Sequence, residues 1–334
     1  MRNYFLIAFI LLLSCSENHD VPNHTPGVVK VFNNLLIVAY GEGGLIITDE
    51  ISGEVLTQIF PPQGMNSIDD FDVDGDLIFV LDSRGRDYMA VFSFDGDKAR
   101  LVSDPVIVEG GPFNGISASN GNLVVSGGTT FLNRFTYSSS GDIQGPISFG
   151  RDRGHPDVIL SSNGQAAFIS TDFGIGLDIE RFGVMSLYIG DELEIPSVIS
   201  ELGIADAGFT AGVTTPVGFP IQTAIYNDNL IVAHGGGLTI IRLIEEFAFG
   251  STTNVDIGIS AISVAVSQDT AYIIGYQDGT PILVRVDLAD LDNPAIINSE
   301  TLITNESIPT SIAVGSNDLY IAAGTAGLII LPKS

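Results

Sequence analysis

The sequence predicts an all-β protein: a seven-bladed β-propeller that forms one domain. Three observations predict this fold. A short pattern of turn and strand recurs seven times, and no segment shows sustained helical periodicity. Most copies lie roughly 40–50 residues apart, which is the length of a four-stranded propeller blade. With 45% hydrophobic and only 16% charged residues, the 334-residue chain also has the composition of a large packed core rather than of a disordered chain.

The recurring unit is a turn followed by an apolar strand that ends in small residues. Residues such as Asn33-Asn34, Asp74-Gly75 and Asn120-Gly121 precede the strand, because Asn, Asp and Gly tolerate the positive φ that a tight hairpin requires. Each copy therefore opens with a hairpin that forms the two inner strands of a blade. The seven apolar strands begin at Leu36, Leu77, Leu123, Ala167, Leu230, Ala271 and Leu319.

A third strand follows each hairpin, as in Gly44–Thr48 and Gly327–Leu331. These strands are nearly continuous apolar runs, which is typical of strands buried on both faces. The interval from Ala167 to Leu230 is the longest, so we expect an insertion in blade four, where Pro196–Leu202 could form one or two helical turns. The chain stops just after the third strand of copy seven, and we therefore expect a three-stranded or poorly closed seventh blade.

Two stretches resemble a known family. Gly43–Asp49 reads GGLIITD, and Ile282–Asp287 reads ILVRVD and is followed by Leu288–Pro294 with its Asp-Asn-Pro ending. Both resemble the LVIVD repeat of β-propellers in exported bacterial lipoproteins. The resemblance runs from about Thr25 to Ser334 and is strong in copies one, six and seven. It implies a propeller scaffold and an exported protein, and it carries no agreed catalytic residues.

The N-terminus predicts export. Arg2 is followed by the apolar run Tyr4–Leu13, which is too short for a permanent transmembrane helix of about 20 residues. Cys15, the only cysteine, follows Leu12, Leu13 and Ser14, and this resembles the lipobox of bacterial lipoproteins. The alternative is an ordinary secretory signal with a chance cysteine. We therefore divide the chain into a signal peptide (1–14), an acylated Cys15 with a flexible tether (15–24), and the propeller (25–334).

This division predicts an outer-membrane lipoprotein of a Gram-negative bacterium, periplasmic or surface-exposed, which touches the membrane only through its lipid anchor. Thirteen Lys and Arg stand against 40 Asp and Glu, a formal net charge of −27. Nucleic acid is therefore excluded as a partner, because phosphate binding needs clustered basic residues. A single Cys also excludes an internal disulfide framework.

Several basic residues are predicted to converge on one face. In an antiparallel blade, the loop between the second and third strands opens on the same face as the link to the next blade. A guanidinium group suits carboxylate, sulfate or phosphate, so this face is a candidate site for an anionic small molecule, a polymer or an acidic protein partner. The alternative is that these groups pair with nearby acids such as Asp87 and Asp152. The candidate residues are Arg84 and Arg86 in the second such loop, Arg151, Arg153 and His155 in the link to blade four, and Arg181 in the fourth such loop.

A second candidate site would hold a metal. Asn66, Asn114 and Asp157 lie near the starts of the innermost strands of blades two to four, where they could face the central channel. Propellers of the calcium-dependent lactonase type hold their metal there. Asp70–Gly75 also matches the opening of a calcium loop, but its twelfth position is Leu81 instead of Glu. Its alternation of Asp with Phe and Val favours a strand, with a looser cation site as the remaining alternative.

Motifs for catalysis are missing from the sequence: it contains no Gly-x-Ser-x-Gly element, no HExxH and no phosphate-binding loop with lysine. We therefore expect no catalytic residues and no cofactor, and a non-catalytic role in binding or scaffolding. The alternative function is a calcium-dependent propeller hydrolase similar to the lactonases, with calcium as its cofactor.

Overall fold

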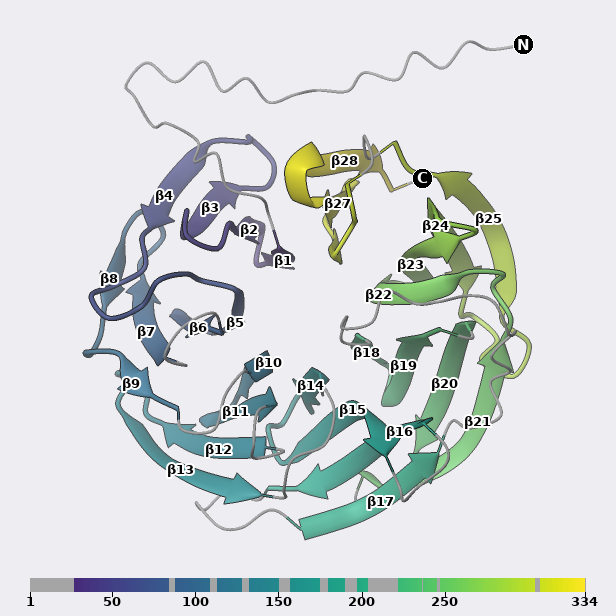
Figure 1. The fold of residues 1–334 in the computed structure, drawn as a ribbon, viewed down its shortest axis with the longest axis horizontal. Coiled ribbons are helices and arrows are strands. Elements are labelled where there is room, and N and C mark those ends of the chain that lie inside the picture. The colour runs from purple at the N-terminus through teal and green to yellow at the C-terminus, as the bar shows by residue number, and fades with distance from the viewer. Residues whose placement is uncertain are drawn as a thin grey trace.

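A computed structural model describes residues 27–83, 88–108, 113–127, 132–149, 157–174, 180–189, 197–203, 222–235, 237–244, 247–303 and 307–333. These residues form seven antiparallel sheets, each with its strands in sequence order from the ring axis to the rim (Figure 1). The chain passes once around the ring, from blade one in purple to blade seven in yellow, and the two end blades lie side by side. The predicted seven-bladed β-propeller is therefore confirmed.

The first three blades contain four, five and four strands. Blade one consists of β1 (Val28–Phe32), β2 (Leu35–Ala39), β3 (Leu45–Asp49) and β4 (Val55–Ile59). Blade two consists of β5 (Asp70–Asp74), β6 (Leu77–Asp82), β7 (Tyr88–Phe94), β8 (Ala99–Leu101) and β9 (Val106–Ile107). Blade three consists of β10 (Phe113–Ser119), β11 (Asn122–Gly127), β12 (Leu132–Tyr137) and β13 (Ile143–Phe149). In blade two, β8 and β9 both pair with β7 and share the rim position.

Blades four to six have four strands each, and blade seven has three in the described residues. Blade four consists of β14 (Asp157–Leu160), β15 (Ala166–Gly174), β16 (Glu180–Tyr188) and β17 (Ser197–Gly203). Blade five consists of β18 (Thr223–Tyr226), β19 (Asn229–His234), β20 (Gly237–Leu243) and β21 (Phe249–Val255). Blade six consists of β22 (Ser260–Ser267), β23 (Thr270–Gln277), β24 (Thr280–Asp287) and β25 (Ala295–Thr301). Blade seven consists of β26 (Ser311–Val314), β27 (Asp318–Ala322) and β28 (Leu328–Pro332).

The predicted turns connect the first two strands of the blades. Asn33 and Asn34 adopt φ of 48° and 63°, so that β1 and β2 pair directly from Phe32 to Leu35. Left-handed residues at both turn positions match the twist of the flanking strands. In blade two the turn lies one residue later than predicted, at Gly75-Asp76 rather than at Asp74-Gly75, because Asp74 still pairs with Leu77.

The hydrophobic core is divided among the joints between blades. Among the described residues, seven clusters of buried side chains each combine strands of two neighbouring blades. The cluster that closes the ring packs Leu36 and Val38 of blade one against Ala313, Tyr320 and Ala322 of blade seven. The second strands β6, β11 and β19 are buried along their whole length, because both of their faces meet a neighbouring blade.

Three details of the prediction have different outcomes. Ser197–Gly203 forms strand β17 instead of the helical turns considered for Pro196–Leu202, because its backbone pairs with β16. The predicted insertion in blade four falls on residues 204–221, outside the described residues. The three-stranded seventh blade agrees with the described residues. In the described part of the chain, no helix has the length and apolar character needed to span a bilayer.

Candidate functional site

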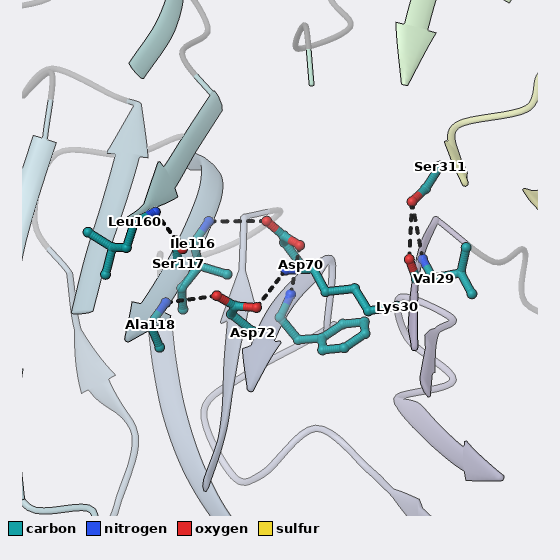
Figure 2. Close-up of polar contacts among 10 residues, drawn as sticks. Val29, Lys30, Asp70, Asp72, Ile116, Ser117, Ala118, Leu160 and Ser311 are labelled. Carbon is teal, nitrogen blue, oxygen red and sulfur yellow. Dashed lines mark hydrogen bonds and ion pairs between the residues drawn. The ribbon is translucent and has the colours of Figure 1, made fainter. Parts of the chain in front are cut away.

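The innermost strands face the ring axis, and each has one edge with no neighbouring strand in its own sheet. The candidate site consists of side chains that accept hydrogen bonds from these edges. Each innermost strand pairs with one neighbour only, so every second backbone N–H points away from its own sheet. A backbone N–H that loses water without finding an acceptor is costly. Short polar side chains at alternate positions of the innermost strands supply the acceptors across the joints, as Figure 2 shows for blades one to four and for blade seven.

The joint between blades two and three has two such contacts. Asp70 and Asp72 project from β5 toward β10 (Figure 2). The Oδ2 atom of Asp70 accepts the Ile116 N–H at 3.1 Å, and the Oδ2 atom of Asp72 accepts the Ala118 N–H at 2.8 Å. The alternation of Asp70 and Asp72 with Phe71 therefore belongs to a strand, and the calcium-loop interpretation of this segment is wrong.

Lys30 connects blade one to the same carboxylates. Its ammonium group lies 2.9 Å from Oδ1 of Asp72 and 5.4 Å from the centre of the Phe71 ring. Burial works against the charged form of Lys30, but the charges of Asp72 and Asp70 outweigh it and raise the pKa of Lys30 above 10.5. The amine therefore remains protonated at neutral pH, which makes it an ion-pair partner rather than a nucleophile.

Serines and one further aspartate bridge the other joints. The Ser311 hydroxyl lies within hydrogen-bond distance of both the N–H and the carbonyl of Val29, and so joins blade seven to blade one (Figure 2). Contacts of the same kind connect blades three and four, four and five, and six and seven. They are Leu160 N–H to Ser117 Oγ (3.1 Å), Thr223 N–H to Asp157 Oδ2 (3.3 Å) and Ile312 N–H to Ser263 Oγ (3.1 Å). Between blades five and six, the Ser263 hydroxyl donates to Oε1 of Gln222.

Lys30, Asp70, Asp72 and Asp157 together form what we name the axial charge cluster. Burial raises the pKa of Asp157 to about 7, and the charge of Asp70 adds to this effect. Burial also raises the pKa of Asp70 to about 6, although Lys30 opposes the rise. Two carboxyl groups thus titrate close to neutrality at the ring axis. Since their oxygens accept backbone N–H groups, their structural task is to hold neighbouring blades together.

Two of the three predicted metal residues, Asn66 and Asp157, have side chains within the described part of the chain. Asp157 lies on β14 as expected, but its Oδ2 atom accepts the Thr223 N–H. Asn66 has an exposed side chain, and its backbone N–H donates to Oδ2 of Asp82 at 2.6 Å. Asn114 lies on β10, and its side chain is outside the description. No group of three or more His, Cys, Asp or Glu in the described ranges is arranged to hold a metal ion.

A second polar cluster lies where the chain enters blade two. Asp82 is fully buried at the end of β6, and its Oδ1 atom accepts the Ser67 hydroxyl at 2.9 Å. The Ser67 hydroxyl is also 2.8 Å from Oδ2 of Asp69, which accepts the N–H and hydroxyl of Ser83, both at 2.9 Å. These contacts fix the segment that leads to Asp70, and thereby position one member of the axial charge cluster.

The predicted anion-binding residues are mostly outside the described part of the chain. Arg84 and Arg86 lie between β6 and β7, and Arg151, Arg153 and His155 lie between β13 and β14. Arg181 lies within strand β16, opposite Phe173, rather than in a loop as predicted, because β16 already begins at Glu180. The side chain of Arg181 is outside the description. Cys15 also precedes the first described residue.

Lys30, Asp69 and Asp82 were not predicted as site residues. A signal for Lys30 was present, since it is the single charged residue in the strand Val28–Phe32. Asp82 ends an apolar strand and resembles an ordinary loop residue in the sequence. Its burial becomes visible only when β6 lies beside the segment that contains Ser67.

Comparisons with known proteins identify the fold but no family. No family model matches the chain, and no curated protein matches its sequence. Solved structures do match. The β-propeller domain of Cps50 (Swd1) from Myceliophteria thermophila is similar with a TM-score of 0.68 and 10% identity, over 93% of this chain and 97% of that one.

Two further structures give the same result. The WD40 repeats of RRP9 match with a TM-score of 0.62 and 11% identity, covering 95% of this chain and 96% of that one. The computationally designed protein Ika8 matches with a TM-score of 0.58 and 10% identity, covering 94% and 98%. At these identities the likeness shows the fold alone. The class is thus a seven-bladed β-propeller. The LVIVD resemblance stays a prediction.

Proposed function

We propose that this protein is an exported, lipid-anchored β-propeller that binds a partner at the outer membrane without catalysing a reaction on it. One observation carries the proposal. The carboxylates at the ring axis accept backbone N–H groups of neighbouring blades, and Lys30 is held by Asp72. The ionisable groups of the axial charge cluster thus hold neighbouring blades together. We therefore assign partner binding to the loops that connect the strands.

The partner that fits the sequence is an acidic protein patch or another anionic ligand. Arg84, Arg86, Arg151, Arg153, Arg181 and His155 are our candidate residues. Because all blades are antiparallel and ordered from axis to rim, the connection from β6 to β7 and the link from β13 to β14 leave their strands on the same face. In a protein with a net charge of −27, a basic patch would orient an incoming anion.

A retention experiment tests the binding site. The full chain in detergent is applied at low salt to polyglutamate and dextran sulfate resins. We expect Arg84→Ala/Arg151→Ala to lose retention, and Arg100→Ala/Arg242→Ala to keep it. The control arginines have exposed side chains and pair with Asp95 and Asp292 in blades two and six. Equal retention of the two variants would contradict the proposed site.

A localisation experiment tests the anchor. Cys15→Ser should move the protein from the membrane to the soluble fraction and remove its label from radioactive palmitate. Continued membrane association of the unlabelled variant would contradict lipid anchoring.

The hydrolase alternative predicts a different result. Incubation with calcium and a panel of lactones, with and without chelator, should give no turnover if the protein is a binding module. Calcium-dependent hydrolysis would overturn the non-catalytic proposal and restore calcium as a cofactor.

A further inference from the structure

One face of the ring carries the links between successive blades. Asp70 and Asp72 of β5 bond to Ile116 and Ala118 of β10 in the same order along both strands, so these innermost strands run in one direction. Because each sheet is antiparallel and ordered along the chain, the link to the next blade leaves from the face where the innermost strands begin. We name this side the link face. The opposite side, with the turns between first and second strands, is the turn face.

Exposed apolar side chains lie at several points of the link face. Phe60, in the link from blade one to blade two, is 64% exposed, and Ile107, at the end of β9, is 54% exposed. The link from blade six to blade seven contributes Ile303 at 65% and Ile308 at 42%. Spread along an arc of the ring, these four side chains suit a flat apolar surface better than a narrow ligand.

The chain enters the ring in the middle of this arc. The Gly27 carbonyl accepts a hydrogen bond from the Thr310 hydroxyl at 2.7 Å, in the link that also carries Ile308. On its other side, a Cβ atom at Gly27 would lie 4.0 Å from the carbonyl oxygen of Asp69, in the link that carries Phe60. Since Gly27 directly precedes β1, the chain before it leaves from the link face.

The proposed lipid anchor keeps this face close to the membrane. The twelve residues from Cys15 to Pro26 span at most about 40 Å, even when fully extended. An acyl chain on Cys15 therefore holds the link face within this distance of the bilayer. Such a short connection raises the effective concentration of the apolar side chains at the membrane surface, so weak contacts are sufficient.

The distribution of charge favours the same orientation. In the described residues, the exposed acids of the link face are Glu42, Asp256 and Asp278. The exposed acids of the turn face are Glu54, Asp76, Asp95, Asp97, Asp142, Asp228, Asp269, Asp287, Asp290 and Asp292. An anionic leaflet repels an acidic surface, so in a chain with a net charge of −27 the turn face is directed away from the membrane.

We propose that the link face lies against the bilayer, with its four exposed apolar side chains in the interfacial region. The inference rests on the proposed lipid anchor, and it goes beyond the expectation that the anchor alone touches the membrane. Phenylalanine and isoleucine stabilise such contact because they bury apolar area at the boundary between headgroups and acyl chains. The connections with Arg84 and Arg151 open on the same face, so lipid phosphate is the anion that we assign to them.

Tryptophan reporters test the orientation, because the chain contains no Trp. The full acylated chain carries Phe60→Trp or Ile303→Trp on the link face, or Ile51→Trp on the turn face, where Ile51 is 72% exposed. Each protein is incorporated into vesicles of phosphatidylethanolamine and phosphatidylglycerol, with or without bromine in the acyl chains. Bromine quenches a tryptophan that it contacts. We expect brominated vesicles to lower the fluorescence of both link-face reporters at least about twofold, and to leave Ile51→Trp unchanged.

A loss variant tests the apolar contact itself. In a protein with the reporter Ile308→Trp, we expect Phe60→Ser/Ile303→Ser to remove the quenching, because the remaining apolar area on the link face is too small to hold it at the membrane. The matched control Ile51→Ser/Ile244→Ser should keep the quenching. Its two residues are 72% and 59% exposed and lie in loops of the turn face.

Vesicle flotation separates the two ways in which the inference can fail. Proteins that float with the vesicles but show equal quenching at Phe60→Trp and Ile51→Trp would overturn the proposed orientation. The lipid anchor would then stand, and the link face would be free for an acidic protein partner. Proteins that do not float with the vesicles would overturn the anchor and this inference together.

Discussion

The ion pair between Lys30 and Asp72 should be worth more than an exposed pair of similar length. The Lys30 ammonium lies 2.9 Å from Asp72, and the two side chains are 35% and 19% exposed. Arg242 and Asp292 are 2.7 Å apart, but their side chains are 37% and 71% exposed. The perturbation is a double-mutant cycle on each pair, with Lys30→Met and Asp72→Asn in one cycle and Arg242→Met and Asp292→Asn in the other.

The expected magnitude follows from the distances and the exposure. Two unit charges 2.9 Å apart attract by about 6 kcal/mol at a dielectric constant of 20, and by about 1.4 kcal/mol in water. Desolvation and the loss of side-chain freedom offset most of this attraction, so we expect a coupling free energy of about 2 kcal/mol for Lys30–Asp72. Solvent screening reduces an exposed pair such as Arg242–Asp292 to about 0–1 kcal/mol.

The assay is urea unfolding followed by far-UV circular dichroism, because the chain contains no Trp. Each cycle yields the coupling free energy as the difference between the double variant and the sum of the single variants. If the coupling at Lys30–Asp72 does not exceed that at Arg242–Asp292 by more than about 0.5 kcal/mol, the inference that blades one and two are joined by this pair is refuted.

Three further predictions concern stability and titration. Phe79 is fully buried, with its ring centre 4.5 Å from that of Tyr137, so Phe79→Ala should lower the free energy of unfolding in urea by about 3–5 kcal/mol. Phe60→Ala, at a side chain that is 64% exposed, should change it by less than about 0.5 kcal/mol, and equal losses would contradict the assigned core. Burial raises the pKa of Asp157 to about 7, so the folded protein holds a proton that the unfolded chain releases near pH 4. This group therefore makes stability fall as pH rises from about 4 to 7, and Asp157→Asn should reduce that fall by about 4 kcal/mol in urea unfolding; an unchanged slope would contradict the burial of this carboxyl. Burial lowers the pKa of His234 to about 4, so its ring proton signal in NMR should not shift between pH 8 and pH 5, and a midpoint near 6.5 would show a solvated ring.

Local patterns in the sequence predicted the repeating unit correctly. Asn33-Asn34 could be recognised as a turn because the left-handed conformation is a property of those two residues and their neighbours. The apolar runs that begin at Leu77, Leu123 and Leu230 predicted strands of the blades, and the structure buries all three strands completely.

The same patterns failed where local propensity gives a weak or ambiguous signal. Pro196–Leu202 was considered as helical turns, but pairing with β16 makes it a strand. Arg181 was assigned to a loop because the repeat indicates the presence of a strand better than its limits, and β16 is longer than the pattern suggested. Asp74-Gly75 looked like a turn pair, whereas the ladder continues through Asp74.

By itself, the sequence determined the number of repeats, their order and the turn chemistry, because each of these depends on residues close together in the chain. Only the tertiary structure decided which polar side chains meet. Lys30 forms an ion pair with Asp72, and Asp157 accepts a hydrogen bond from the N–H of Thr223, in both cases between different blades. The partner of each group depends on how adjacent sheets are staggered when the ring closes. That stagger is set by the packing of the seven hydrophobic clusters in the described residues, which no single repeat contains.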